Sequence, residues 1–223
     1  MINIIGAGGV GSWLAPAMCK LVGASRVTII DGDKLEEKNL DRQLFSTDEI
    51  GQFKADALAK KYGCLSIPQW YSHGAMQIDF GDIFMVCVDN NAGRRSVLET
   101  CDANECLAIF GANEVTSAEA YYYDYMWSEG PADPRYYYPE ILTDKTNDPR
   151  RLAIGCTGEA QENNKQLVSA NFMAAALMQH LYVAWIIERA GIDGDAIEYL
   201  PFRIRQNLSK YETLRSVDLK EKE

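Results

Sequence analysis

Motifs that would mark a zinc ribbon or a disulfide framework are missing from this sequence. It contains six cysteines, and no two of them have the C-x-x-C spacing on which zinc ribbons depend. Several of the cysteines lie in apolar runs, where a free thiol behaves as a small hydrophobic side chain. We therefore expect free thiols, no zinc and a reducing, cytoplasmic location.

An excess of positive charge is also missing. The chain has 22 lysines and arginines against 32 aspartates and glutamates, which gives a formal net charge of −10. A protein with this balance has no electrostatic footprint for a polyphosphate backbone, so we do not expect a nucleic acid as its partner. No signal peptide precedes the first apolar segment, and no internal repeat is visible.

One stretch is long enough to cross a membrane. Residues 167–187, "LVSANFMAAALMQHLYVAWII", are mostly apolar, and about 20 such residues suffice to span a bilayer. Polar side chains interrupt the stretch at Asn171, Gln179 and His180. We therefore predict a buried central helix and no membrane span, because a doubly wound sheet needs apolar helices on its faces.

Strand and helix patterns alternate through the first half of the chain. Residues 83–88 form a continuous apolar run, which is typical of a parallel strand buried on both faces. The weaker run at 64–72 is interrupted by Pro68 and is predicted at the edge of the sheet. This order indicates an α/β fold with a mostly parallel, Rossmann-like doubly wound sheet. Strands are expected at 2–5, 26–31, 83–88 and 106–112, and helices at 11–21, 47–62 (with a break at Gly51) and 92–104.

The pattern changes in the second half. The aromatic run "SAEAYYYDYMW" suits an added antiparallel strand, and the long irregular stretch at 128–165 resembles a functional loop more than an ordinary connection. The apolar helix, a last strand at 196–205 and a charged tail follow. We expect one domain over residues 1–223, with a nucleotide-binding half at 1–113, an added strand and crossover segment at 114–165, and a helix and final strand at 166–223.

A glycine motif opens the chain. Gly6, Gly8 and Gly11 form a G-x-G-x-x-G sequence between a predicted strand and a predicted helix, where backbone N–H groups can receive a phosphate. Asp31 follows 20 residues after Gly11, at the end of the second strand, where a carboxylate can accept hydrogen bonds from ribose hydroxyls. These features predict a nucleotide site that suits NAD as well as ATP.

The segment "DGDKLEEKNLDRQLFSTDEIGQFK", residues 31–54, favours ATP. Asn39, Arg42 and Gln43 lie close together, and Lys54 comes early in a predicted helix, where its charge opposes the helix dipole. A cation at that position is better explained if an anion lies nearby. Cations and amides that converge on a nucleotide indicate chemistry at its phosphates, where developing charge must be stabilised.

Asp89 and Asn90 follow a buried central strand. Open α/β sheets place ligand-binding groups at the carboxyl ends of such strands. A carboxylate among phosphates is repelled unless it holds Mg²⁺, which bridges the two, so Asp89 is predicted as a magnesium ligand. Asn90 is either a second ligand or, as we favour, the cap of the following helix.

Taken in order, these motifs resemble the ubiquitin-activating-enzyme-like superfamily, the ThiF/MoeB-type adenylyltransferases. The series G-A-G-G-V-G, D-G-D, N-L-x-R-Q, G-x-x-K and V-D-N-x-x-x-R covers residues 2–113. The resemblance implies ATP- and Mg²⁺-dependent adenylation of the C-terminal glycine carboxylate of a small ubiquitin-like protein by a homodimer. Asp31 would hold the ribose, Arg42 and Lys54 the phosphates, and Asp89 the Mg²⁺. The nucleotide-binding set is Gly6, Gly8, Gly9, Gly11, Asp31, Asp33, Asn39, Arg42, Gln43, Lys54, Asp89 and Asn90.

The chain also departs from that family. The two C-x-x-C zinc pairs of many bacterial members are absent. An N-terminal helix that carries an arginine into the neighbouring subunit's site is missing as well, because the sequence opens on the first strand. The candidates to replace that arginine are Arg94, Arg95, Arg150 and Arg151.

Cys156 is the one cysteine in the long crossover segment. Gly155 and Gly158 flank it, and Arg150 and Arg151 are positioned in sequence to lower its pKa. Many relatives of the family pass the activated carboxyl from AMP to a cysteine. Two alternatives stay open: a functional thiol, which we slightly favour, and an inert loop thiol.

Two other functions compete with adenylation. An NAD-dependent oxidoreductase explains the glycines and Asp31 but gives Arg42, Lys54 and Asp89 no role, and 223 residues leave no room for a separate substrate domain. A non-catalytic subunit that only binds a partner is disfavoured because the whole polar set is present.

Overall fold

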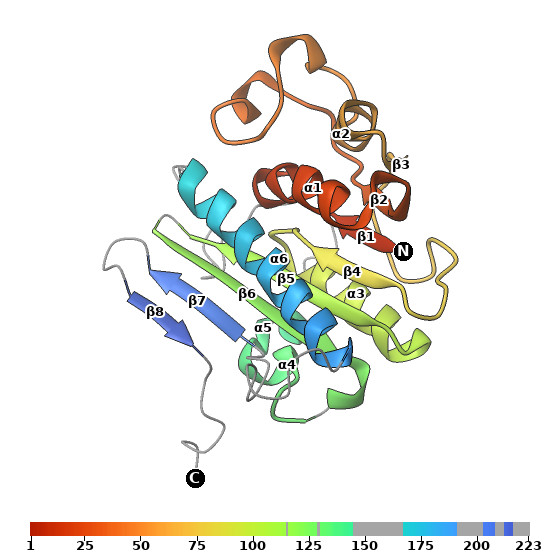
Figure 1. The fold of residues 1–223 in the computed structure, drawn as a ribbon, viewed down its shortest axis with the longest axis vertical. Helices are drawn as coiled ribbons and strands as arrows, with labels where there is room; N and C mark the ends of the chain where they lie inside the picture. Colours follow the sequence, from red (N-terminus) through yellow and green to blue (C-terminus); the bar gives the residue numbers. More distant parts are fainter. Residues whose placement is uncertain (115, 129, 145–166, 191–202, 208–211, 216–223) are drawn as a thin grey trace.

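One mixed sheet runs through the protein (Figure 1). The structure is a computed structural model of the chain, and it describes residues 1–114, 116–128, 130–144, 167–190, 203–207 and 212–215. In these residues the strands lie in the order β3-β2-β1-β4-β5-β6-β7-β8. They are β1 (Ile2–Ile5), β2 (Val27–Ile30), β3 (Leu65–Ile67), β4 (Ile83–Val86), β5 (Leu107–Asn113), β6 (Ser117–Asp124), β7 (Arg203–Asn207) and β8 (Glu212–Arg215).

The strand directions confirm the predicted fold class. Strands β1 to β5 are parallel, and β6, β7 and β8 extend the sheet in antiparallel fashion. Because β1 lies between β2 and β4, the chain first builds the sheet outward on one side and then crosses to the other. In open α/β sheets this reversal leaves a crevice outside the carboxyl ends of the two strands, which is where ligands bind.

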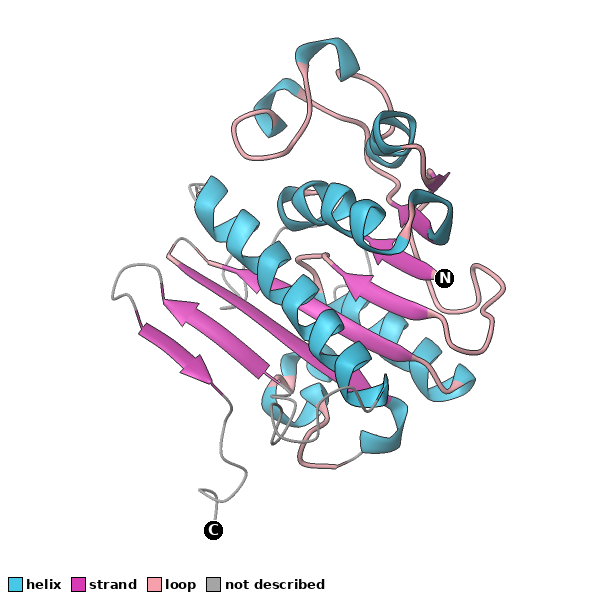
Figure 2. Ribbon diagram, viewed as in Figure 1, coloured by secondary structure: helices cyan, strands magenta, loops and turns pink. Residues whose placement is uncertain are grey.

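Helices cover both faces of the sheet (Figure 2). One face carries α1 (Gly9–Val22), α2 (Lys54–Tyr62) and α6 (Val168–Ala190), and the other carries α3 (Asn91–Asn104) and α5 (Glu140–Thr143). The short α4 (Pro134–Tyr137) precedes α5. Single 3₁₀ turns complete the described helical segments: η1 (Ala24–Arg26), η2 (Glu37–Asn39), η3 (Thr47–Glu49) and η4 (Tyr125–Trp127).

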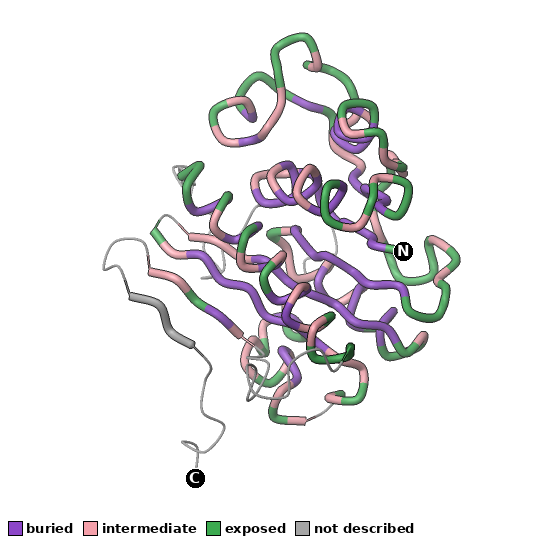
Figure 3. The backbone as a smooth tube through the Cα atoms, in the orientation of Figure 1, coloured by how far each residue is buried: buried purple, intermediate pink, exposed green. Residues whose placement is uncertain are grey.

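The sheet separates two apolar cores, and its central strands are buried along their length (Figure 3). Alternate residues of one strand point to opposite faces, so Ile4 joins the core under α1 and α6 whereas Ile5 joins the core under α3 and α5. This two-sided burial explains why the strands near the N-terminus appear in the sequence as unbroken apolar runs.

The predicted elements of the first half are confirmed with small shifts in their ends. The helix expected at 47–62 is interrupted, as predicted around Gly51: η3 ends at Glu49 and α2 begins at Lys54. Gly51 has a φ of +87°, a left-handed conformation that favours glycine and ends the first turn. Strand β3 lies at the edge of the sheet, as its proline predicted.

The described part of the second half confirms the added strand and the long helix, but the stretch predicted as irregular contains the short helices α4 and α5. The aromatic run forms the antiparallel strand β6. The expected last strand is seen from Arg203, and the preceding residues 196–202 lie outside the described residues. Strand β8 was not predicted from the sequence, and it pairs with β7 in antiparallel fashion.

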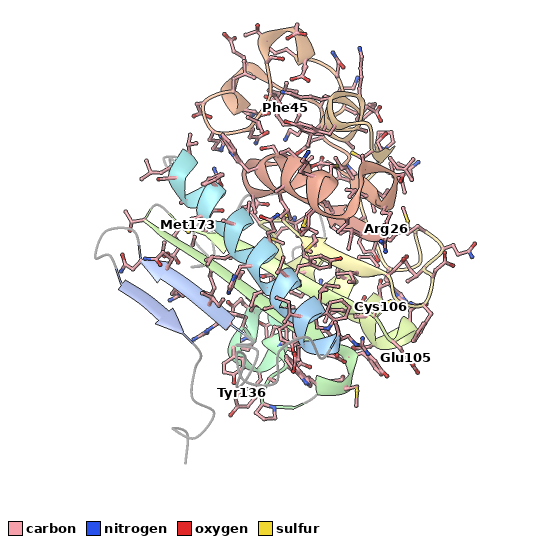
Figure 4. All side chains as sticks on the ribbon, viewed as in Figure 1. Arg26, Phe45, Glu105, Cys106, Tyr136 and Met173 are labelled. Carbon is pink, nitrogen blue, oxygen red and sulfur yellow. The ribbon has the colours of Figure 1, made fainter. Side chains whose placement is uncertain are left out.

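Helix α6 packs against the sheet, as predicted for a central helix, and it is buried on one side. By length and composition it could cross a membrane, and 44% of its most apolar window is buried in the protein. Its inner face, with Met178 and Leu181, packs against the sheet and α1. Met173, labelled in Figure 4, also packs against this core. The outer face exposes Phe172 and Ile186.

Candidate nucleotide-binding site

The glycine turn joins β1 to α1 through two close backbone contacts. Gly6 has a φ of +94°, and a Cβ atom there would lie 3.1 Å from the backbone of Cys87. A Cβ atom on Gly11 would lie 1.9 Å from the carbonyl oxygen of Gly6. Both positions therefore require glycine. The two contacts allow the start of α1 to pack closely against the carboxyl ends of β1 and β4.

Helix α1 begins directly after the glycine turn, and no side chain caps its N-terminus. Its first intrahelical bond runs from the Ser12 N–H to the Gly8 oxygen, at 3.0 Å. The N-cap residue, Gly8, has no side chain to accept hydrogen bonds from the N–H groups of Gly9, Val10 and Gly11. A helix N-terminus in this state carries a partial positive charge and free donors, which suit a phosphate.

Asp31 organises the turn from the neighbouring strand. One carboxylate oxygen accepts the Ala7 N–H at 2.6 Å, and the other accepts the Asp33 N–H at 2.7 Å. The side chain is buried, and burial raises its pKa although the charge of Lys54 opposes that rise. Asp31 thus fixes the glycine turn to the end of β2, and its contact with a ribose stays a prediction.

Lys54 and Asp33 form an ion pair at the edge of the same crevice. The Lys54 residue is 6% exposed, and its Nζ lies 3.1 Å from Asp33 Oδ2. Lys54 is the first residue of α2, where its charge opposes the helix dipole. The anion that this position led us to expect is therefore Asp33 in the structure, and the contact with a phosphate stays a prediction.

The segment between β2 and α2 is held by its own polar side chains. Asn39 is buried, and its Oδ1 accepts the Glu36 N–H at 3.0 Å, so this residue shapes η2. Gln43 is also buried, and its Nε2 lies 3.9 Å from the position that a Cβ atom on Gly8 would take. Gln43 therefore borders the glycine turn, and its contact with the nucleotide stays a prediction.

Arg42 is engaged within its own loop. Its guanidinium donates to the Lys38 carbonyl oxygen at 3.1 Å and to Asp41 Oδ1 at 2.9 Å, while Trp13 Nε1 of α1 donates to the Arg42 carbonyl oxygen at 3.1 Å. Among the described contacts, none joins Arg42 to Lys54. The structure fixes the Arg42 backbone to α1, and the contact of its guanidinium with a phosphate stays a prediction.

Asn90 is a helix cap, as we favoured. Its Oδ1 accepts the Gly93 N–H at 2.7 Å, at the start of α3. Asp89 is exposed just beyond the end of β4, beside Val88, whose Cγ1 lies 3.1 Å from the position of a Cβ atom on Gly6. Asp89 is therefore the residue that follows Val88, whose side chain packs against the glycine turn.

A single exposed carboxylate fits Mg²⁺ bound together with phosphates, because this ion usually takes one or two carboxylates and keeps the rest of its shell for phosphates and water. Among the described residues there is no cluster of three or more histidine, cysteine, aspartate or glutamate side chains that could hold a metal alone. The role of Asp89 as a magnesium ligand stays a prediction.

The candidate arginines have different environments. Arg95 donates to the carbonyl oxygens of Ile141 and Asp144, at 3.2 and 3.0 Å, and so caps the end of α5. Arg94 is buried and lines a pocket. Arg150 and Arg151 lie outside the described residues, as does Cys156.

The pocket beside Arg94 lies at the carboxyl end of β5, next to the strand that leads to Asp89. Arg205 contributes a second cation, but Glu119 pairs with that side chain at 2.7 Å. The Nδ2 of Asn113 is buried without a hydrogen-bond partner in the structure. Glu114 and Glu140 also line this pocket, so acidic and basic side chains are mixed in it and it shows no preference for an anion.

Sequence reasoning missed Asn171 as a site residue. It lies near the start of α6, is 0% exposed, and packs against Gly9. The signal available in the sequence was an asparagine inside an apolar helical run, which the membrane argument noted only as an interruption.

The comparisons with known proteins agree with the motif-based resemblance. Residues 1–65 match the ThiF family. The chain is 32% identical over 160 residues to the adenylyltransferase and sulfurtransferase uba4 of Aspergillus fumigatus, covering 66% of this chain and 29% of that protein. It is 26% identical over 124 residues to ubiquitin-like modifier-activating enzyme 5 of Drosophila virilis, covering 46% of this chain and 31% of that protein. The matches thus span less than a third of these relatives.

Solved structures share the fold. The E. coli MccB structure with MccA-N7isoASN aligns with a TM-score of 0.67 at 16% identity, over 96% of this chain and 62% of that one. E. coli MccB with ATP aligns with a TM-score of 0.61 at 19% identity, over 96% of this chain and 63% of that one. At these identities the likeness establishes the Rossmann-like fold.

Replacing Gly11 by alanine tests the glycine turn. The new methyl group would collide with the Gly6 carbonyl oxygen, so we expect Gly11→Ala to lower the free energy of unfolding by about 3 kcal/mol or more. Gly8→Ala is the matched control, because its Cβ atom would come no closer than 3.9 Å to another group. Urea unfolding of the two variants measures the difference, and equal stability would contradict the described contact.

Proposed function

Because residues 1–65 match the ThiF family, we propose that this chain is an ATP-dependent adenylyltransferase acting on a small ubiquitin-like protein. The observation that carries the proposal is the pairing of an uncapped helix N-terminus at Gly8 with a buried lysine, Lys54, along one crevice. The named relatives support the reaction type, because one is an adenylyltransferase and the other activates a ubiquitin-like modifier.

The reaction joins a carboxylate to AMP. A C-terminal carboxylate oxygen of the partner attacks the α-phosphorus of ATP, the bond to the β-phosphate breaks, and pyrophosphate leaves with its charge. The protein must hold the two reactants in line and stabilise the charge that develops on the phosphates. No acid or base is required at the attacking carboxylate, because it is already ionised at neutral pH.

Each part of the crevice has a task in this scheme. The first N–H groups of α1 receive a phosphate, and Lys54 exchanges its Asp33 partner for phosphate oxygens. Asp33, whose side chain is 48% exposed, is then free to accept hydrogen bonds from the nucleotide. Mg²⁺ held by Asp89 would neutralise phosphate charge when it is bound.

Two features of the proposal rest on the family resemblance alone. They are the homodimer and the C-terminal glycine of the partner, whereas the cytoplasmic location rests on the unpaired cysteines of the sequence. An NAD-dependent oxidoreductase is the rival, and it gives no task to the buried Lys54 or to Asp89. A partner-binding subunit without activity is the third reading, and the exchange assay below separates it from an enzyme.

Lys54 and Asp89 are tested by ATP–pyrophosphate exchange in the presence of a small protein ending in Gly-Gly, taken from a neighbouring gene. We expect Lys54→Met and Asp89→Asn each to lower the exchange rate about 100-fold or more, because the first removes a cation that stabilises phosphate charge and the second removes the carboxylate that would hold Mg²⁺. Melting temperatures should stay close to that of the wild type for Asp89→Asn, because that side chain is exposed.

Exposed side chains of α2 and α3 give the controls. Lys60→Met and Glu99→Gln remove the same charges at exposed positions of α2 and α3, and both should exchange at the wild-type rate. Exchange by Lys54→Met and Asp89→Asn at the rate of these controls would contradict the assigned roles. No exchange by the wild type with any such partner would favour the silent subunit.

Cys156 is proposed to accept the acyl group from AMP. Its sulfur would attack the carbonyl carbon of the adenylate, the bond to the phosphate oxygen would break, and AMP would leave. The five described cysteines are poor candidates, because burial raises the pKa of every one of them. For Cys64 the pKa rises to about 12, so this thiol is protonated at neutral pH.

A non-reducing gel tests this step after incubation of enzyme, ATP and partner. We expect a thiol-sensitive conjugate with the wild type and with Cys64→Ala, and none with Cys156→Ala. A conjugate of equal yield with Cys156→Ala would assign the acyl group to another residue. Accumulation of the adenylate without any conjugate would show that the enzyme stops after adenylation and forms no thioester.

A further inference from the structure

Asn171 is a buried amide without a partner, and it lies against the glycine turn. The residue is 0% exposed, and neither its Oδ1 nor its Nδ2 has a hydrogen-bond partner in the structure. Buried amides are nearly always hydrogen-bonded, and an unpaired one destabilises the fold. We therefore expect this amide to gain a hydrogen-bond partner when the protein binds a ligand.

The position of the amide is defined by Gly9. A Cβ atom on Gly9 would lie 2.5 Å from Asn171 Oδ1 and 2.9 Å from Nδ2, so the side chain occupies the space that a larger residue in the first turn of α1 would fill. Helix α6 carries it there, because α6 packs along α1 (Figure 1). The Asn171 amide, which has no hydrogen-bond partner, thus lies beside the first turn of α1, whose N–H groups have no side-chain cap.

The two groups are complementary to a phosphate. The N–H groups of α1 and the two hydrogens of Nδ2 are donors, whereas phosphate oxygens are acceptors. Oδ1 is an acceptor and can take an N–H of the first turn that the phosphate leaves unpaired. An anion at this helix terminus would therefore accept hydrogen bonds from the N–H groups of α1 and from Asn171 Nδ2.

We infer that Asn171 binds a phosphate of the nucleotide through Nδ2 and so links α6 to the phosphate site. The inference rests on the proposed function, because it takes the crevice at α1 as the nucleotide site. It adds a residue from the second half of the chain to a site that was otherwise assembled from the first 90 residues. Asn171 acts here as a binding residue, with no part in bond making.

Asn171→Ala tests the inference by titration of the purified full chain with ATP and with adenosine, each competing with a fluorescent ATP analogue. We expect the Kd for ATP to rise about ten- to hundredfold, because a hydrogen bond to a charged group is lost. The Kd for adenosine, which has no phosphate, should stay within twofold. A loosened fold would instead weaken both ligands alike.

Two controls complete the experiment. Ser169→Ala changes an exposed residue in the same turn of α6 and should leave both Kd values unchanged. The melting temperature of ligand-free Asn171→Ala should equal or exceed that of the wild type, because an unpaired buried amide is removed.

The possible failures have different meanings. An unchanged Kd for ATP in Asn171→Ala, or an equal loss for ATP and adenosine, would overturn the inference and leave the proposed function intact. A wild-type chain that binds no ATP would overturn the proposed function and this inference together.

Discussion

The close approach of Gly11 to the Gly6 carbonyl oxygen is the contact on which the crevice depends. It lets α1 begin directly at the exit of β1, so that the free N–H groups of its first turn face the gap between β1 and β4. Asp31 can then reach the Ala7 N–H from the end of β2. A side chain at position 11 would move the helix outward, and the phosphate-binding groups would no longer converge.

Electrostatics set a second constraint. The chain has a net charge of −10, yet its proposed ligand is an anion, so positive charge must be concentrated locally. The partial charge of the α1 terminus and the buried Lys54 supply it. Asp33 pairs with Lys54 in the described state and gives that buried cation a counter-ion, which an incoming phosphate can replace.

The parts of the fold that depend on local patterns could be predicted from the sequence. Unbroken apolar runs predicted the central strands, Pro68 predicted the edge position of β3, and the glycine spacing predicted the turn before α1. Asn90 was predicted as a cap from its place before a helix. In each case neighbouring residues in the sequence determine the structure.

The parts that depend on distant contacts could not be predicted. Lys54 at the start of α2 pairs with Asp33 in the segment after β2. Only the folded chain shows that these two side chains form an ion pair. Asn171 contacts Gly9 across 162 positions of the sequence, so its place in the helix gave no sign of a phosphate site. The sequence likewise did not show that α6 would be buried on one side only. That depends on which other elements of the folded chain cover the helix, and a local sequence pattern carries no information on this.

Calorimetric titration of the purified chain with ATP and Mg²⁺, and separately with NAD, tests the central claim most directly. The buried Lys54 and the uncapped start of α1 are arranged for a polyphosphate. We therefore expect saturable binding of ATP at least tenfold tighter than that of NAD. Tight binding of NAD without measurable binding of ATP would contradict the account and favour an oxidoreductase.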